Sequence, residues 1–151
     1  MNKPELKEYL TKAFPSCTIE ESVDFVVMRV NKEELLATAN ELKQNRETLF
    51  DFLFCLTAVD YQPDFEVVYH LRATTFQHEM VLKVTLTDRE NPNLDSVTSI
   101  WRAAEMFECE VFDLFGIKFN GFDGLRRLFM PQDWPGFPLR KDYTDANIIT
   151  R

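Results

Sequence analysis

The last third of this 151-residue chain restricts its fold more than any other feature, because it is apolar but follows neither helical nor strand periodicity. Every glycine of the chain and three of its seven prolines lie between Gly116 and Pro138. Residues 118–139 contain nine large apolar residues: Phe119, Phe122, Leu125, Leu128, Phe129, Met130, Trp134, Phe137 and Leu139. Segments of more than about 12–15 residues without regular structure are usually functional or disordered, and this one is too apolar to stay disordered in water. We expect residues 118–151 to form an irregular segment that packs on its own domain and, in its distal half, docks on a partner.

Residues 1–117 predict an α+β domain that forms one structural unit with this segment. Apolar residues recur at helical spacing over residues 4–13 and again after Asn31, where Asn31 and Glu34 resemble a capping box. Strand-like patterns follow the first helix and then the second, at residues 18–21, 24–30, 50–59, 65–72 and 80–86.

The strand patterns and a third helix set the expected architecture. Residues 50–59 are almost continuously apolar and predict a central strand that is covered on both faces, whereas the next two strands alternate and form a hairpin. A helix over 96–115 ends at Gly116. The order α-β-β-α-β-β-β-α indicates a two-layer domain with helices on one face of a mixed sheet.

Charge and composition exclude several classes of function. The net charge is −8, which argues against binding to nucleic acid or to anionic lipid. Residues 1–100 carry 10 Lys and Arg against 17 Asp and Glu, whereas residues 101–151 carry 7 against 8. An acidic body with a nearly neutral, apolar end is typical of a protein that is soluble on one side and docks on the other.

The three cysteines are expected to be reduced thiols in a reducing compartment. Cys17, Cys55 and Cys109 form no C-x-x-C pair, so we expect no zinc site or iron–sulfur cluster on this chain. The start of the sequence predicts no secretory signal, and its apolar runs are shorter than the roughly 20 residues of a membrane helix. If the protein works at a membrane, another protein of the same complex holds it there.

Glu108 is the most unusual residue of the predicted third helix. It falls within the apolar stripe of that helix, where an ionised carboxylate needs a partner. Arg126 and Arg127 follow the helix, and a guanidinium matches a carboxylate with two parallel hydrogen bonds. We expect Glu108 to anchor the irregular segment through one of these arginines. The alternative is a slightly different helix register in which Glu108 is an ordinary surface residue.

No pattern in the sequence predicts catalysis. Glu105, Glu108, Glu110 and Asp113 do not share one face and no histidine joins them, so structural salt bridges are favoured over a metal or an acid–base pair. His70 and His78 lack a third convergent ligand. The sequence also lacks a phosphate-binding loop, a dinucleotide fingerprint and a nucleophile motif. We therefore expect no catalytic, cofactor-binding or metal-binding residue on this chain.

Two charged stretches lie among aromatic residues in the irregular segment. Arg126 and Arg127 precede Phe129, and the run Leu139-Arg140-Lys141-Asp142 follows Trp134 and Phe137. Charge runs are usually solvated, but arginine and aromatic side chains are enriched at interface hot spots. These stretches are therefore candidates for a buried or interfacial role.

The third helix, its turn and the segment that follows resemble the motifs of a known family. The helix and its turn read Trp101-x-x-Ala104-x-x-x-Glu108-x-Glu110-x-x-Asp113-x-x-Gly116-Ile117-x-Phe119-x-Gly121. The following segment reads Leu125-Arg126-Arg127-Leu128, then Met130-Pro131-x-Asp133-Trp134-x-Gly136-x-Pro138-Leu139-Arg140-Lys141-Asp142-Tyr143. Both are similar, in the same order, to motifs of the C subunit (the 30 kDa subunit family) of the proton-pumping NADH:quinone oxidoreductase, respiratory complex I. The specific match covers residues 97–143.

The resemblance implies a non-catalytic structural subunit on the cytoplasmic side of the inner membrane, peripheral and held through its neighbours in the complex. It implies docking on the large D subunit, which with the B subunit forms the quinone cavity, while FMN, iron–sulfur clusters and quinone lie elsewhere in the complex. The residues that would serve docking or structure are Glu108, Glu110, Asp113, Arg126, Arg127, Trp134, Pro138, Leu139, Arg140, Lys141, Asp142 and Tyr143.

The sequence departs from the family motifs at several positions, and two alternative functions stay open. Cys109 stands where the family usually has Arg, residues 121–124 replace Gly-His-Pro-Asp, and Phe137 replaces His. One alternative is the equivalent subunit of a membrane-bound energy-converting hydrogenase or another donor-linked complex. The other, from a different class, is a small carboxylate-dependent enzyme.

Overall fold

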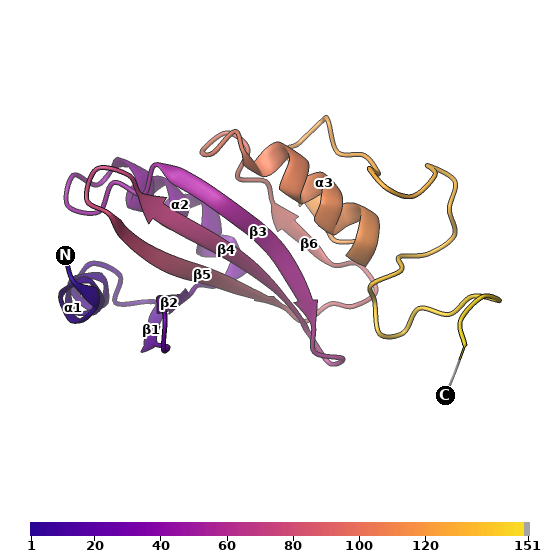
Figure 1. Cartoon of the computed structure of the whole chain (residues 1–151), viewed down its shortest axis with the longest axis horizontal. Helices are drawn as coiled ribbons and strands as arrows, with labels where there is room; N and C mark the ends of the chain where they lie inside the picture. Colours follow the sequence, from indigo (N-terminus) through magenta and orange to yellow (C-terminus); the bar gives the residue numbers. More distant parts are fainter. Residues whose placement is uncertain (150–151) are drawn as a thin grey trace.

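The computed structural model describes residues 1–149 and has the predicted α+β architecture (Figure 1). The elements in chain order are α1 (Lys3–Ala13), β1 (Thr18–Glu21), β2 (Val26–Arg29), the 3₁₀ turn η1 (Lys32–Glu34), α2 (Leu35–Gln44), β3 (Phe52–Asp60), β4 (Phe65–Ala73), β5 (His78–Leu86), β6 (Asn93–Asp95), α3 (Ala104–Phe115) and β7 (Lys118–Asn120). No helix among these residues is long and apolar enough to span a membrane.

Five strands form a mixed sheet in the order β1-β2-β5-β4-β3. Strands β2 and β5 run parallel, and the other neighbours are antiparallel. A second, parallel ladder pairs β6 with β7. The prediction of a mixed sheet is therefore confirmed, but the prediction that residues 50–59 form its central strand is wrong. Strand β3 lies at an edge, helix α3 packs along it, and its burial differs between the two faces, with Leu53, Leu56 and Ala58 buried on one face and Phe52 exposed.

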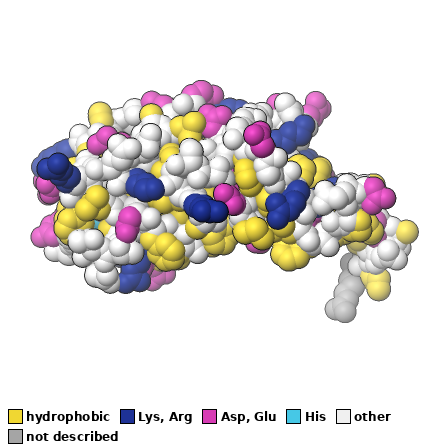
Figure 2. All heavy atoms as spheres, turned by 90° about the horizontal axis from the view of Figure 1, so that it is seen from above, with side chains coloured by type: hydrophobic (Ala, Val, Ile, Leu, Met, Phe, Trp, Pro, Cys, Tyr) yellow, Lys and Arg dark blue, Asp and Glu magenta, His cyan; other side chains and the backbone are white. Residues whose placement is uncertain are grey.

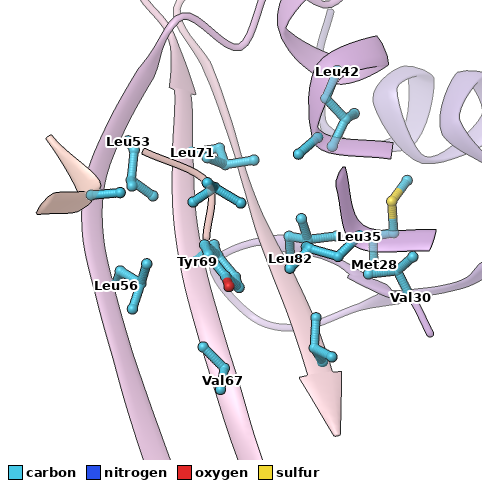
Figure 3. Packing of buried hydrophobic residues seen from close by; sticks show 14 of the residues in the cluster. Met28, Val30, Leu35, Leu42, Leu53, Leu56, Val67, Tyr69, Leu71 and Leu82 are labelled. Atoms are coloured by element: carbon cyan, nitrogen blue, oxygen red, sulfur yellow. The ribbon is translucent and has the colours of Figure 1, made fainter. Parts of the chain in front are cut away.

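One face of the sheet carries the hydrophobic core. Side chains from Met28, Leu56, Tyr69 and Leu82 converge on it, and Leu35 belongs to the helix α2 that covers it (Figure 3). On the opposite face a small cluster of Val27, Val68 and Val81 packs with Phe25. The strict alternation of β4 and β5 sorts their residues between these two faces, because successive side chains of a strand point in opposite directions.

Helix starts differ from the predicted ones. The capping box lies at α1, where Glu5 N–H donates to Asn2 Oδ1 (3.0 Å) and Asn2 N–H donates to Glu5 Oε2 (2.9 Å). The predicted box at Asn31 and Glu34 is wrong. The Asn31 side chain makes no capping bond to the backbone, and a 3₁₀ turn precedes α2 instead.

The third helix begins at Ala104, so the predicted helix over 96–115 is wrong in its first part. Ser96 and Val97 both donate hydrogen bonds to the carboxylate of Glu108, which is 12 residues beyond Ser96 along the chain. In a continuous helix 12 residues span about 18 Å, so these bonds require the chain to fold back before α3 begins. Helix α3 ends as predicted at Gly116, whose φ is 74°.

The irregular segment starts later than expected. Residues 118–120, predicted to be its beginning, form strand β7, and Phe119 is buried. Between residues 121 and 149 the described chain contains no helix or strand, only turns and bends. Positions 150–151, the end of the predicted segment, lie outside the described residues.

Candidate docking site on the carboxyl-terminal segment

Residues 121–149, called here the carboxyl-terminal segment, follow β7, return to helix α3 and the end of the sheet, and extend away from the body only in their last part (Figure 1). Figure 2 shows its last part as a narrow projection with hydrophobic side chains at its surface. Since the described part of this segment contains no helix or strand, its shape depends on side-chain contacts. Two groups of charged residues supply them.

The first anchor is the buried pair of Asp113, on α3, and Arg127. The Arg127 guanidinium donates from Nη1 to Asp113 Oδ1 (3.2 Å) and to the Asp113 carbonyl (3.0 Å). From Nη2 it donates to the carbonyls of Trp134 (2.8 Å) and Gly136 (3.0 Å). It also lies over the Phe137 ring, 4.7 Å from the centroid. One side chain thus joins α3 to three positions of the carboxyl-terminal segment.

The second oxygen of Asp113 binds the backbone of the segment. Asp113 Oδ2 accepts hydrogen bonds from the amides of Leu128 (3.1 Å), Phe129 (2.7 Å) and Met130 (3.2 Å). Burial acts to raise the pKa of Asp113, but these three donors together with Arg127 hold it below its ordinary value. The carboxylate is therefore ionised at neutral pH and fixes the direction of three consecutive residues.

Packing against Gly116 supports the first anchor. A Cβ atom on Gly116 would lie 2.6 Å from Cδ2 of Phe137, so the ring rests directly on the helix end. The amide of Leu139 donates to the carbonyl of Leu114 (2.9 Å). The glycine is required both for the close approach and for its left-handed backbone.

The second anchor, made of Asp60, Arg89, Arg140 and Asp142, holds the next part of the segment to the end of the sheet. Arg89 donates to both oxygens of Asp60 (2.6 and 3.0 Å), and the Lys141 amide donates to Asp60 Oδ2 (2.9 Å). Arg140 binds Asp142 and the carbonyl of Arg89. Hydrogen bonding to Arg89, together with the amides of Lys141 and Gln62, holds the pKa of Asp60 far below its ordinary value despite burial.

Both arginines of the second anchor also lie near the Phe65 ring, at 4.5 Å for Arg89 and 5.0 Å for Arg140. Sequence reasoning missed Asp60 and Arg89. The only available signal was an isolated Asp at the end of a strand, which is too common to be informative.

A third contact closes the segment on itself. The indole of Trp134 donates to the Tyr143 hydroxyl (3.1 Å), which donates to Asp145 (2.6 Å). Pro138, between Trp134 and Tyr143 in the chain, is half-buried. Trp134 and Tyr143, both predicted site residues, therefore connect two parts of the segment with each other.

The anchors leave several large apolar side chains exposed, beside exposed charged residues such as Asp133 and Lys141. Phe129 is 67% exposed and Leu139 53% exposed, although the backbone amide of each is hydrogen-bonded to α3. Arg126 is also exposed and binds only the nearby carbonyl of Gly124 (3.3 Å). Phe129 and Leu139 therefore point outward from a backbone that is bonded to α3, whereas Ile148 and Ile149, which are also exposed, lie beyond the two anchors.

Glu108 is buried, as predicted, but its partner is not an arginine. Its carboxylate accepts hydrogen bonds from Ser96 Oγ (2.7 Å) and the Val97 amide (2.8 Å). The predicted pairing with Arg126 or Arg127 is wrong, because Asp113, further along α3, takes Arg127. Burial raises the pKa of Glu108 to about 7, against the opposing effect of these two donors.

The other acidic candidate on α3 is not an anchor. Glu110 is half-buried and forms no ion pair within residues 1–149. It therefore contributes to neither of the two charged groups that hold the segment.

The remaining candidates for chemistry do not converge. His78 Nε2 lies 2.8 Å from the Thr48 carbonyl, and His70 packs against Phe25 and Phe54. In the described part of the chain no three His, Cys, Asp or Glu side chains come together as metal ligands. Cys109 is buried, and its thiol points to the Gly124 carbonyl (3.6 Å).

Comparison with known proteins identifies consistent relatives. Residues 28–147 match the family model described as "Respiratory-chain NADH dehydrogenase, 30 Kd subunit". The C subunit of the NADH-quinone oxidoreductase of Moorella thermoacetica is 44% identical over 136 residues, covering 89% of this chain and 90% of that protein. The C subunit from Roseiflexus castenholzii is 38% identical over 148 residues, covering 94% of this chain and 84% of the relative.

Two further matches differ in extent or in distance. A longer protein of Phocaeicola vulgatus, named as the C/D subunit of NADH-quinone oxidoreductase, is 41% identical over 120 residues, which are 79% of this chain and 23% of that protein. Among solved structures, a chain of the membrane-bound sulfane sulfur reductase, an archaeal respiratory membrane complex, superposes with a TM-score of 0.82. It is 23% identical and covers 97% of this chain and 88% of its own length, so it shows the same fold.

Proposed function

Because this chain belongs to the 30 kDa subunit family of respiratory-chain NADH dehydrogenases, we propose that it is a structural subunit that docks on the large D subunit of an NADH:quinone oxidoreductase. It supports electron transfer from NADH to quinone by holding its partners in place. FMN, the iron–sulfur clusters and quinone are bound by other proteins of the complex, and the chain is peripheral, on the cytoplasmic side of the membrane.

The observation that carries this proposal is that ion pairs within the chain fix the conformation of the carboxyl-terminal segment. Arg127, Arg140 and Asp142 are all paired within the chain, so they are not available as the main attraction for a partner. Of the exposed large apolar side chains of the segment, Phe129 and Leu139 are the two whose backbone amides are bonded to α3. Large apolar side chains that are exposed on a fixed backbone are typical of interface anchors.

Preorganisation explains why a segment without regular structure can bind well. A disordered segment loses conformational freedom on binding, and that loss weakens affinity. Here the three amide bonds to Asp113 and the bonds of the second anchor already order the backbone. The partner surface that fits has apolar hollows for Phe129 and Leu139.

Relatives named as C/D subunits support the D subunit as the partner. In Phocaeicola vulgatus and in Bacteroides thetaiotaomicron the matching stretch is 23% and 24% of a longer chain. A single polypeptide with both parts keeps them at high effective concentration, which is favourable for domains that bind each other.

The test uses Phe129→Ala and Leu139→Ala in the full chain, and the readout is the affinity for the purified D subunit. Truncation of an interface anchor typically costs about 1–3 kcal/mol, so we expect each variant to bind roughly 5- to 150-fold more weakly. The matched controls are Phe76→Ala, at the β4–β5 turn, and Val23→Ala, in the β1–β2 loop, which remove exposed apolar side chains outside the segment. Wild-type affinity of the double variant at positions 129 and 139 would refute the proposal.

The host complex is tested separately. The C-subunit relatives at 38–44% identity favour an NADH dehydrogenase over a hydrogenase or another donor-linked complex. Capture of the tagged chain from native membranes, followed by identification of the electron-input module, distinguishes them. A flavin and an NADH site support the proposal, and a nickel–iron site contradicts it.

A further inference from the structure

Glu108 is a buried acid that the docking proposal does not use. The residue is 0% exposed, and the described residues offer it no ion pair. Two neutral donors, Ser96 and the Val97 amide, are its hydrogen-bond partners. An ionised carboxylate that is removed from water without a cation is strongly disfavoured, so the neutral acid is the form that this site accommodates.

A hydrogen-bond relay connects this acid to the surface. Ser96 Oγ lies 2.7 Å from Glu108 Oε2 and 2.8 Å from Thr98 Oγ1, and Thr98 is half-buried. Hydroxyl groups both donate and accept, so the relay can reverse its direction when the carboxyl gains or loses its proton. A proton can therefore be exchanged with solvent without unfolding of the core.

The ionisable groups that face Glu108 are themselves acids. Tyr69, on β4, is fully buried, and its hydroxyl has no hydrogen-bond partner among residues 1–149. Burial, followed by the negative charges of Glu108 and Asp95, raises the pKa of Tyr69 well above its ordinary value. Asp95, on β6, precedes Ser96. Neither of these acids compensates a negative charge on Glu108.

We propose that Glu108 is a proton-operated latch, which in its protonated form holds Ser96 and Val97 on helix α3 and on ionisation releases them. The amide of Ser96 donates to the Asn120 carbonyl (2.9 Å). Asn120 ends β7, immediately before the carboxyl-terminal segment. Release of Ser96 therefore affects the backbone at Asn120, where the carboxyl-terminal segment begins.

The direction of the pH effect follows from the raised pKa. In the closed latch the pKa of Glu108 is about 7, and in an open, solvated loop it is near the ordinary 4.5. The stabilisation of the closed latch is therefore fully present below pH 4.5 and is lost as pH rises through about 7. Between pH 5 and pH 8 the opening equilibrium is expected to increase roughly 50- to 100-fold.

The test measures the isolated full chain, so its outcome does not depend on binding to the D subunit. Amide hydrogen exchange at Val97 is followed from pH 5 to pH 8 and is divided by exchange at Gly116, whose amide bonds to Phe112 within α3. We expect the ratio to rise roughly 50- to 100-fold. In parallel, NMR of the Glu108 carboxyl carbon is expected to show a midpoint near 7.

Two variants make the result decisive. Glu108→Gln keeps the shape and an oxygen that accepts hydrogen bonds but cannot ionise, so the pH dependence of the ratio is expected to disappear. Ser96→Ala removes a donor that favours the ionised form, so the carboxyl midpoint is expected to move to higher pH. A carboxyl midpoint near 4.5, or an unchanged pH dependence in Glu108→Gln, would overturn the proposal.

Discussion

At the scale of single residues, the position of one arginine decides whether the carboxyl-terminal segment has a structure. Arg127 is the only cation paired with the buried carboxylate of Asp113 within the described residues, and it also binds the carbonyls of Trp134 and Gly136. Pairs of this kind add little compared with an apolar substitute, but loss of one partner leaves a buried charge uncompensated.

Arg127→Ala is therefore expected to lower the free energy of unfolding by about 3–5 kcal/mol. The measurement is urea unfolding of the purified chain. The control is the neighbouring Arg126→Ala, whose exposed side chain binds one carbonyl only, and which is expected to change stability by less than about 0.5 kcal/mol. Equal effects of the two variants would show that the first anchor does not hold the segment.

At the scale of elements, helix α3 determines how the segment leaves the domain. Its last turn carries Asp113, and its end at Gly116 lies under Phe137. The chain thus turns away from α3 at Gly116, and Phe137 later packs on the same position. A side chain at position 116 interferes with both roles.

Gly116→Ala is expected to destabilise the protein by about 2–4 kcal/mol, since it combines left-handed backbone strain with a clash against Phe137. Gly121→Ala is a matched control, because Gly121 also has a positive φ (83°) but has no atom within 4 Å of the added Cβ. Its expected cost is about 1 kcal/mol, the strain alone. Thermal unfolding measures the loss of stability in both variants, and the difference between the two losses is the cost of the clash with Phe137. Equal losses of stability would contradict the predicted clash.

Across the entire chain, the two anchors join the segment to the body at several elements. The sheet end, helix α3 and the β5–β6 connection all contribute to the two anchors. Deletion of the segment therefore changes the body as well as the candidate interface. Loss of a complex after deletion would not by itself demonstrate docking, which is why single exposed side chains are the sharper test.

A chain of residues 1–124 keeps β7 but loses Arg127, and we expect it to unfold at a lower temperature than the full chain. The reason is the carboxylate of Asp113, which loses its cation and its three amide donors. Asp113→Asn in the shortened chain is expected to recover part of the lost stability, whereas in the full chain it is expected to be destabilising. If it destabilises both chains equally, the charge of Asp113 is not what couples segment and body.

Several features of the fold could be predicted from the sequence because they depend on neighbouring residues. Alternation within residues 65–72 and 80–86 predicted β4 and β5, and spacing of apolar residues predicted α1 and α2. The end of α3 at Gly116 follows from one residue type. Burial of Glu108 could also be predicted, because a helical projection needs only the residues on that helix.

Local patterns in the sequence were thus enough to predict the α+β class and the strands of the hairpin. The edge position of β3, the start of α3 at Ala104 and the pairing of Arg127 with Asp113 became known from the folded chain. These features depend on contacts between residues that are far apart in the sequence. The Lys141 amide and Asp60 are 81 residues apart, and hydrogen bonds of that kind depend on how the sheet and helix are placed, which no local pattern encodes.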